Sequence, residues 1–122
     1  MSSRPRRALG RHLLVELYGC DRKTISDPDA VRKAMLAAAK ACRATVVAHV
    51  FREFKPHGVS GMVVISESHM AVHTWPEHDF ASVDVFTCGR KVRPEKALPV
   101  LKRRLGSSRM TALELQRGML LG

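Results

Sequence analysis

The spacing of apolar residues changes along the first half of the chain, and this change predicts a strand followed by a helix. Leu9 to Tyr18 alternates loosely between apolar and polar positions, which is typical of a strand. Asp27-Pro28 then combines an N-cap residue with proline at the first helical position. The apolar residues that follow recur at helical spacing: Val31, Ala34, Met35, Ala38, Ala39 and Cys42. We expect an amphipathic helix of about four turns here.

Strand patterns dominate the middle of the chain. Segments rich in strand-forming residues cover 44–54, 61–66, 69–75 and 80–87, and turn residues separate them. A weaker helix is expected over 94–105, where Pro99 either kinks the helix or marks its start, because proline removes a helical hydrogen bond. Residues 110–115 are expected to form a last strand.

This order of elements predicts an α+β fold, a two-layer sandwich in which both helices cover one face of a mostly antiparallel sheet. Residues 1–8 are expected to be a basic flexible tail, and residues 9–122 a single domain. A sheet covered on one side leaves its second face bare, and in a chain of 122 residues a second copy is the expected cover. The sequence therefore predicts a homodimer.

Charge alters this picture only at the edges of the chain. The formal net charge is +10, which by itself favours a polyanion partner and keeps a small basic nucleic-acid-binding protein as one alternative. Residues 59–75, however, contain one charged side chain, Glu67, so the basic residues are expected to form a solvated rim and to bind no nucleic acid. Because no apolar run is long enough to span a bilayer and the basic start lacks an apolar signal block, we expect a cytoplasmic protein without a membrane partner.

Residues able to perform acid-base or nucleophilic chemistry gather in the segments 58–61, 66–69, 73–77 and 86–89. Glu67 and Ser68 are expected at a turn between two strands, with His69, Ala71 and His73 on one face of the second strand. Spacing alone does not choose a nucleophile among the serines of this region. A zinc site is a further alternative on the following residues: His69, His73, His78 and Cys88. Their spacing matches no standard zinc motif, so no metal is expected.

Two segments carry a resemblance to a known family: GVSGMVVISESHMAVHTWPE (58–77) and FTCG (86–89). From Leu9 to Gly89 the chain resembles the short prokaryotic S-adenosylmethionine decarboxylases, which process themselves and depend on a pyruvoyl group. The resemblance implies that autocatalytic serinolysis at Glu67–Ser68 converts Ser68 into the covalent pyruvoyl cofactor, leaving a β chain of residues 1–67 and an α chain of residues 68–122. The pyruvoyl group would form a Schiff base with S-adenosylmethionine and release carbon dioxide, supplying the aminopropyl donor for spermidine biosynthesis.

The resemblance also implies roles for individual residues. His73 would be the base in processing with Ser60 assisting, and Cys88 would donate a proton during turnover. Glu77 would bind the ribose hydroxyls, whereas Phe54 and Trp75 would either stack near the adenine or sulfonium or simply pack in the core. A pyruvoyl-dependent ornithine or arginine decarboxylase on the same scaffold is the nearest alternative, because its processing chemistry would be the same.

Overall fold

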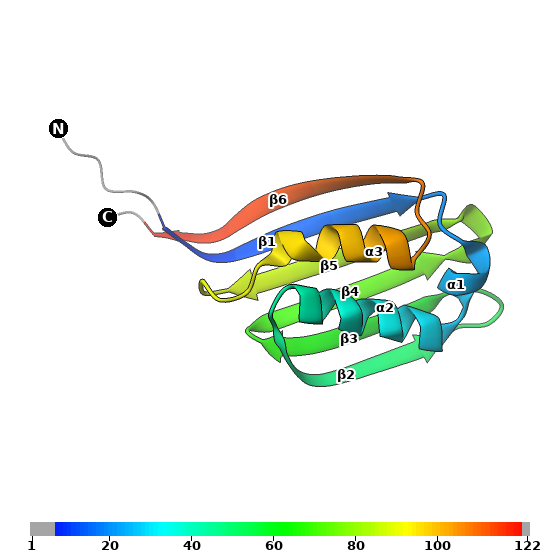
Figure 1. Ribbon diagram of the computed structural model, residues 1–122, viewed down its shortest axis with the longest axis horizontal. Coiled ribbons are helices and arrows are strands. Elements are labelled where there is room, and N and C mark those ends of the chain that lie inside the picture. The colour runs from blue at the N-terminus through cyan, green and yellow to red at the C-terminus, as the bar shows by residue number, and fades with distance from the viewer. Residues whose placement is uncertain (1–6, 121–122) are drawn as a thin grey trace.

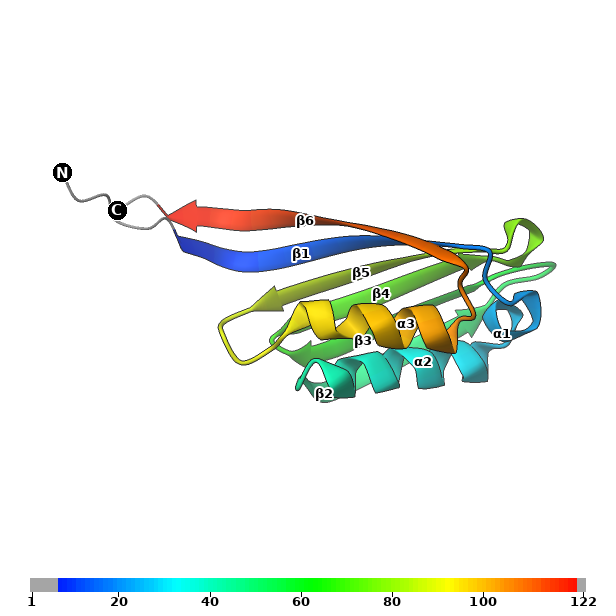
Figure 2. The same cartoon turned by 45° about the horizontal axis from the view of Figure 1, so that its top comes forward.

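Six strands form one antiparallel sheet in the order β2-β3-β4-β5-β1-β6 in the computed structural model, which describes residues 7–120 (Figure 1). The strands are β1 (Arg7–Tyr18), β2 (Thr45–Glu53), β3 (Val59–Ser66), β4 (Ser68–Trp75), β5 (Phe80–Cys88) and β6 (Arg109–Leu120). The helices are α1 (Arg22–Ser26), α2 (Pro28–Ala41) and α3 (Ala97–Arg104), with short 3-10 helices η1 (Pro76–His78) and η2 (Pro94–Lys96). Figure 2 shows α2 and α3 on the same side of the sheet, so the predicted α+β two-layer sandwich is confirmed.

The first and last strands of the sheet are longer than the sequence predicts. β1 begins at Arg7, where it pairs with Leu120, so it includes the last two residues of the predicted tail; residues 1–6 of that tail lie outside the described residues. β6 runs to Leu120 and is longer than the predicted strand 110–115. Pairing with β1 supplies hydrogen-bond partners along this whole edge, so the strand continues where the apolar pattern weakens. The five-residue helix α1 was not predicted, because one helical turn is too short to show a period.

Pro99 lies inside α3 rather than at its start. The helix begins at Ala97, directly after η2, so Pro99 is its third residue and the predicted start at Pro99 is wrong. The first four N–H groups of a helix have no partner within the helix. Proline at this position therefore removes no hydrogen bond, and its ring lies exposed on the solvent side.

The core lies between the sheet and the two longer helices. The apolar stripe predicted for α2 is buried, and Cys42 just beyond the helix is buried with it. The Asp27 side chain accepts a hydrogen bond from the Asp29 N–H at 3.0 Å and so caps the helix that carries this stripe. Strand side chains that alternate toward the helices complete the core: Leu13, Val15, Leu17, Val63, Met70, Val72, Val83 and Val85.

The opposite face of the sheet, here called the open face, carries exposed apolar side chains. Met62 and Val64 of β3 are 43% and 40% exposed, and Leu113 of β6 is 61% exposed. No helix among residues 7–120 covers this face (Figure 2). No helix in the same residues is both long enough and apolar enough to cross a membrane. The expectation of an apolar bare face is confirmed.

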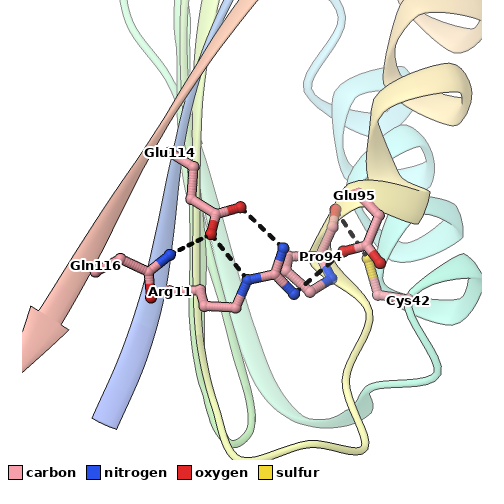
Figure 3. A network of polar contacts seen from close by, with 6 residues as sticks. All are labelled: Arg11, Cys42, Pro94, Glu95, Glu114 and Gln116. Carbon is pink, nitrogen blue, oxygen red and sulfur yellow. Dashed lines mark hydrogen bonds and ion pairs between the residues drawn. The ribbon is translucent and has the colours of Figure 1, made fainter. Parts of the chain in front are cut away.

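One ion-pair network ties the edge strand β6 to the rest of the sheet (Figure 3). Arg11 of β1 contacts Glu114 of β6 at 2.8 Å and Glu95 of η2 at 3.4 Å. The hydrogen bond from Arg11 lowers the pKa of Glu114, and the same bond raises the pKa of Arg11. Because both partners are partly exposed, the contribution to stability is modest, and it adds to the pairing of β6 with β1.

Thr74 connects three elements next to the polar end of β4. Its Oγ1 accepts a hydrogen bond from the Val59 N–H at 2.9 Å and donates one to the Ile25 carbonyl at 2.8 Å. The Thr74 residue is only 6% exposed, so water cannot replace either bond. β3, β4 and α1 are thereby held together at one buried hydroxyl.

Replacing this hydroxyl with a methyl group is expected to destabilise the fold. Thr74→Val keeps the shape of the side chain but leaves the Val59 N–H and the Ile25 carbonyl unpaired, and each buried unpaired group costs about 1–3 kcal/mol. We expect a loss of about 2–4 kcal/mol in the free energy of unfolding, measured by urea denaturation in a Ser68→Ala background that keeps the chain whole. Thr111→Val on the exposed edge strand is the matched control, and equal midpoints for the two variants would contradict this role of Thr74.

Candidate active site

The corner between β3 and β4 presents the serine that the resemblance selects. β3 ends at Ser66, Glu67 alone forms the turn, and Ser68 begins β4, so the predicted position of Glu67 and Ser68 is confirmed. Ser68 is half-buried and pairs with Thr87 of β5. Its Oγ lies 3.1 Å from Nδ1 of His69. The corner thus combines an accessible hydroxyl with an adjacent imidazole.

The carbonyl group that precedes Ser68 is held by the neighbouring strand. The Cys88 N–H donates a hydrogen bond of 2.9 Å to the Glu67 carbonyl oxygen. If a nucleophile attacks this carbonyl, negative charge develops on the oxygen that already receives the N–H, which is how oxyanion holes stabilise acyl transfer. Strand pairing also brings Cys88, predicted as a proton donor, to the corner at Glu67–Ser68.

A second group of predicted residues lies at the other end of β4. Ser60 and His73 are register partners in β3 and β4, and Ser60 Oγ lies 2.9 Å from Nδ1 of His73. Both line a pocket of about 240 Å³ together with Phe54, Trp75 and Glu77. Five residues that the sequence analysis assigned to processing or to the substrate therefore surround one cavity.

The two groups are separated within one chain. His73 lies five residues after Ser68 on the same strand, which at about 3.3 Å per residue places the two about 17 Å apart along β4. Within one chain His73 does not reach Ser68, and its role in processing stays a prediction. The histidine beside Ser68 is His69, which the sequence analysis considered only as a strand-face residue and a zinc ligand, although its adjacency in the sequence could have indicated this contact.

Phe54 and Trp75 are not core residues, so the core-packing alternative of the sequence analysis is wrong, and their contact with a substrate stays a prediction. They are 46% and 39% exposed. The Trp75 ring lies 5.4 Å from that of Phe80 and 6.4 Å from that of His73, measured between ring centroids. Gly58 shapes the turn that presents Phe54: it has a φ of 101°, and a Cβ there would lie 2.9 Å from the Thr74 carbonyl oxygen. Both aromatic rings are available to a ligand in the pocket.

The zinc alternative receives no support from the geometry. Within residues 7–120, no three side chains of His, Cys, Asp or Glu are placed to hold a metal ion together. His69 and His73 lie on the same strand face, as predicted, but they contact different serines. Their rings therefore serve separate hydrogen bonds.

The three cysteines differ in their surroundings. Cys20 and Cys42 are buried in the core, as expected, and this burial raises the pKa of each thiol to about 11. Their Sγ atoms donate to the carbonyl oxygens of Leu17 and Pro94. Cys88 is half-buried at the corner with Ser68. Cys88 is thus the cysteine best placed for chemistry.

Comparison with known proteins gives consistent results over most of the chain. The profile of the S-adenosylmethionine decarboxylase family matches residues 11–118. Two curated relatives are named S-adenosylmethionine decarboxylase proenzyme. The protein of Acidithiobacillus ferrooxidans is 47% identical over 92% of this chain and 84% of its own length, and that of Acetivibrio thermocellus is 50% identical over 92% and 90%.

Two solved structures are similar in fold. The crystal structure of the adenosylmethionine decarboxylase from Aquifex aeolicus has a TM-score of 0.85 and 34% identity, covering 93% of this chain and 94% of that one. A monomer of the Trypanosoma brucei protein AdoMetDC-delta26 has a TM-score of 0.63 and covers 85% of this chain and 45% of that one. At 19% identity, the second likeness concerns the fold alone.

Alkylation by iodoacetamide at pH 8 is expected to label Cys88 in the folded protein well before Cys20 or Cys42. A thiol with a pKa of about 11 has about one thiolate per thousand molecules at this pH, and the core also excludes the reagent. Peptide mass spectrometry of the Ser68→Ala protein measures the order of labelling. In urea all three cysteines should react, and early labelling of Cys20 or Cys42 in the folded protein would contradict the assignment.

Proposed function

The chain belongs to the S-adenosylmethionine decarboxylase family, and from this we propose that it cuts itself between Glu67 and Ser68 and then decarboxylates S-adenosylmethionine. The observation that carries the proposal is the corner at Ser68, where the carbonyl to be attacked already receives the Cys88 N–H. The name proenzyme, which the curated relatives bear, supports self-processing. The product would supply aminopropyl groups for spermidine.

Self-processing uses groups that the corner provides. Ser68 Oγ attacks the Glu67 carbonyl carbon, and the bond between that carbon and the Ser68 nitrogen breaks, which converts the peptide bond to an ester. Removal of the Ser68 α-hydrogen then expels Glu67 as a carboxylate. Water converts the remaining dehydroalanine to a pyruvoyl group and ammonia, so the products are a β chain of residues 1–67 and an α chain of residues 68–122.

The residues around the corner and the pocket fit the pyruvoyl group and the substrate. The group supplies a ketone that accepts the substrate amine and an electron sink for the pair released with carbon dioxide. Cys88 borders the place where the group forms, so its thiol is the proposed proton donor. Glu77 presents an exposed carboxylate to the pocket for the two ribose hydroxyls, and the Phe54 and Trp75 rings suit a flat purine or a sulfonium.

The pocket also favours a nucleoside over the basic amino acids of the alternative decarboxylases. Ornithine and arginine have no aromatic ring to stack on Phe54 or Trp75 and no diol for Glu77. Two exposed rings in one cavity would therefore remain without a specific partner. The names of the two curated relatives agree with the nucleoside substrate.

We further propose that the working unit is a homodimer of processed αβ units whose open faces meet. The open face exposes apolar side chains, which a second copy would bury. In such a dimer a two-fold axis would place the two open faces in contact with their β4 strands running in opposite directions. The Ser68 corner of one copy would then lie near the His73 pocket of its partner. His73 and Ser60 could then act at the Ser68 of the opposite copy, which the distance along β4 prevents within one chain.

The proposed function predicts both a cut and a substrate preference. Purified wild-type protein should separate into two fragments, the first ending at Glu67, whose summed mass equals the precursor plus water minus ammonia. The processed protein should release carbon dioxide from S-adenosylmethionine and not from ornithine or arginine at matched concentration. Intact-mass spectrometry and carbon dioxide release measure the two results.

Ser68→Ala is the control for this experiment, because it should stay whole and inactive while it remains folded. Persistence of the intact wild-type chain after long incubation would overturn the processing step. Preference for ornithine or arginine would overturn the substrate and leave the processing step in place.

If the site is shared between two copies, two inactive variants should complement each other and restore self-processing. Co-expressed Ser68→Ala and His73→Ala chains form mixed dimers in which one site combines an intact Ser68 with an intact His73 from the other copy. We expect pyruvoyl-terminated α chain from the His73→Ala chain in these dimers, whereas each variant expressed alone should produce little. Distinct tags isolate the mixed dimers, and mass spectrometry detects the fragment.

The matched control pairs His73→Ala with a chain carrying both Ser68→Ala and His73→Ala. This mixture has the same intact Ser68 but no intact His73, so it should not regain self-processing. If purified mixed dimers of the two single variants also fail to recover, the shared site is wrong.

A further inference from the structure

We propose that His69 is the base of the first self-processing step and takes the proton from Ser68 Oγ as that oxygen attacks the Glu67 carbonyl. The inference rests on the proposed function and names a residue for a step that His73 is too distant to serve within its own chain. Ser68 Oγ and His69 Nδ1 are 3.1 Å apart. A nucleophilic hydroxyl within hydrogen-bond reach of an imidazole is the usual arrangement for activating serine.

The His69 ring is fixed by an aromatic neighbour rather than left free to rotate. His69 and Phe86 are register partners in β4 and β5, and their rings meet edge to face with centroids 5.6 Å apart. Phe86 is itself stacked on His12 at 5.4 Å and lies 5.6 Å from the Arg117 guanidinium. Gly10 leaves room for this ring, because a Cβ there would collide with Phe86. These contacts hold His69 in one orientation beside Ser68.

The other histidine of the candidate site is engaged elsewhere. His73 Nδ1 lies 2.9 Å from Ser60 Oγ at the far end of β4. Within residues 7–120, the Ser68 hydroxyl makes one hydrogen bond, and its partner is His69. We therefore assign the two proton transfers to different residues. His69 takes the hydroxyl proton in the first step, and His73 takes the α-hydrogen in the second.

The proposed step balances without any added reagent. The Oγ–H bond breaks as His69 Nδ1 takes the proton and Oγ bonds to the Glu67 carbonyl carbon. The charge that develops on the carbonyl oxygen is held by the Cys88 N–H, 2.9 Å from that oxygen in the uncut chain. When the carbon–nitrogen bond breaks, Nδ1 returns the proton to the Ser68 nitrogen. The products are an ester and a free amine, and the imidazole is regenerated.

Two substitutions separate proton transfer from positioning. His69→Asn places an amide oxygen near the position of Nδ1, where it can accept the Ser68 hydrogen bond but cannot take the proton. His69→Ala removes both functions. If His69 is the base, both variants should process about 10²–10⁴-fold more slowly than wild type, the usual range for general base catalysis. Added imidazole should restore part of the rate in His69→Ala.

The experiment follows full-length protein made by pulse-labelled cell-free translation. Gels and mass spectrometry measure the fraction cut over time, and hydroxylamine, which cleaves esters, detects any chain stopped after the first step. Unprocessed His69→Ala should stay resistant to hydroxylamine, since its Glu67–Ser68 bond is still an amide. Circular dichroism reports whether each variant folds, and His49→Ala, an exposed histidine on β2, should process at the wild-type rate.

Each result decides one question. Processing of His69→Asn at the wild-type rate would reduce His69 to a positioning residue and overturn the proposal, even if His69→Ala were slow. Hydroxylamine-sensitive ester in His69→Ala would also overturn it, because the first step would then have occurred without the imidazole. Failure of the wild type itself to cut would instead reject the proposed function.

Discussion

β4 pairs with β3 on one side and with β5 on the other, and the register of these two ladders decides which strand residues face one another in the candidate site. At one end it places Ser68 opposite Thr87, so that the next residue, Cys88, reaches the Glu67 carbonyl. At the other end it places His73 opposite Ser60. Because successive strand residues point to opposite faces, a slip of one residue would turn His73 toward the helices and break the hydrogen bond with Ser60.

The same sheet explains how one small chain can hold a corner and a pocket that do not touch. A strand is stiff, so residues at its two ends cannot approach each other without unfolding it. The proposed second copy on the open face would remove this limit, because a two-fold axis would give each corner a pocket from the partner. The helix side is less suited to the same contact: α3 exposes Lys102, Arg103 and Arg104 there, and like charges repel.

The corner resembles the acyl-transfer sites of enzymes in its parts, although the chain acts on itself. Ser68 is the proposed nucleophile, His69 the proposed base, and the Cys88 N–H the proposed donor to the developing oxyanion. Two of the three are consecutive in the sequence and the third arrives through strand pairing. Conversion of the peptide bond to an ester, the proposed first step, would therefore need no substrate and no partner molecule, only the folded corner.

The sequence determined the local elements and, through the family resemblance, the predicted chemistry. Alternation and helical spacing located the strands and α2, because these features depend on residues close together in the chain. The prediction of Ser68 came from the family resemblance of the segments 58–77 and 86–89. Tertiary structure alone decided that His73 is remote from Ser68, that Phe54 and Trp75 are exposed, and that β6 runs to Leu120. Periodicity indicates which face of a strand or helix a side chain occupies. Only strand pairing and packing fix which residues meet across the sheet and which apolar positions remain uncovered.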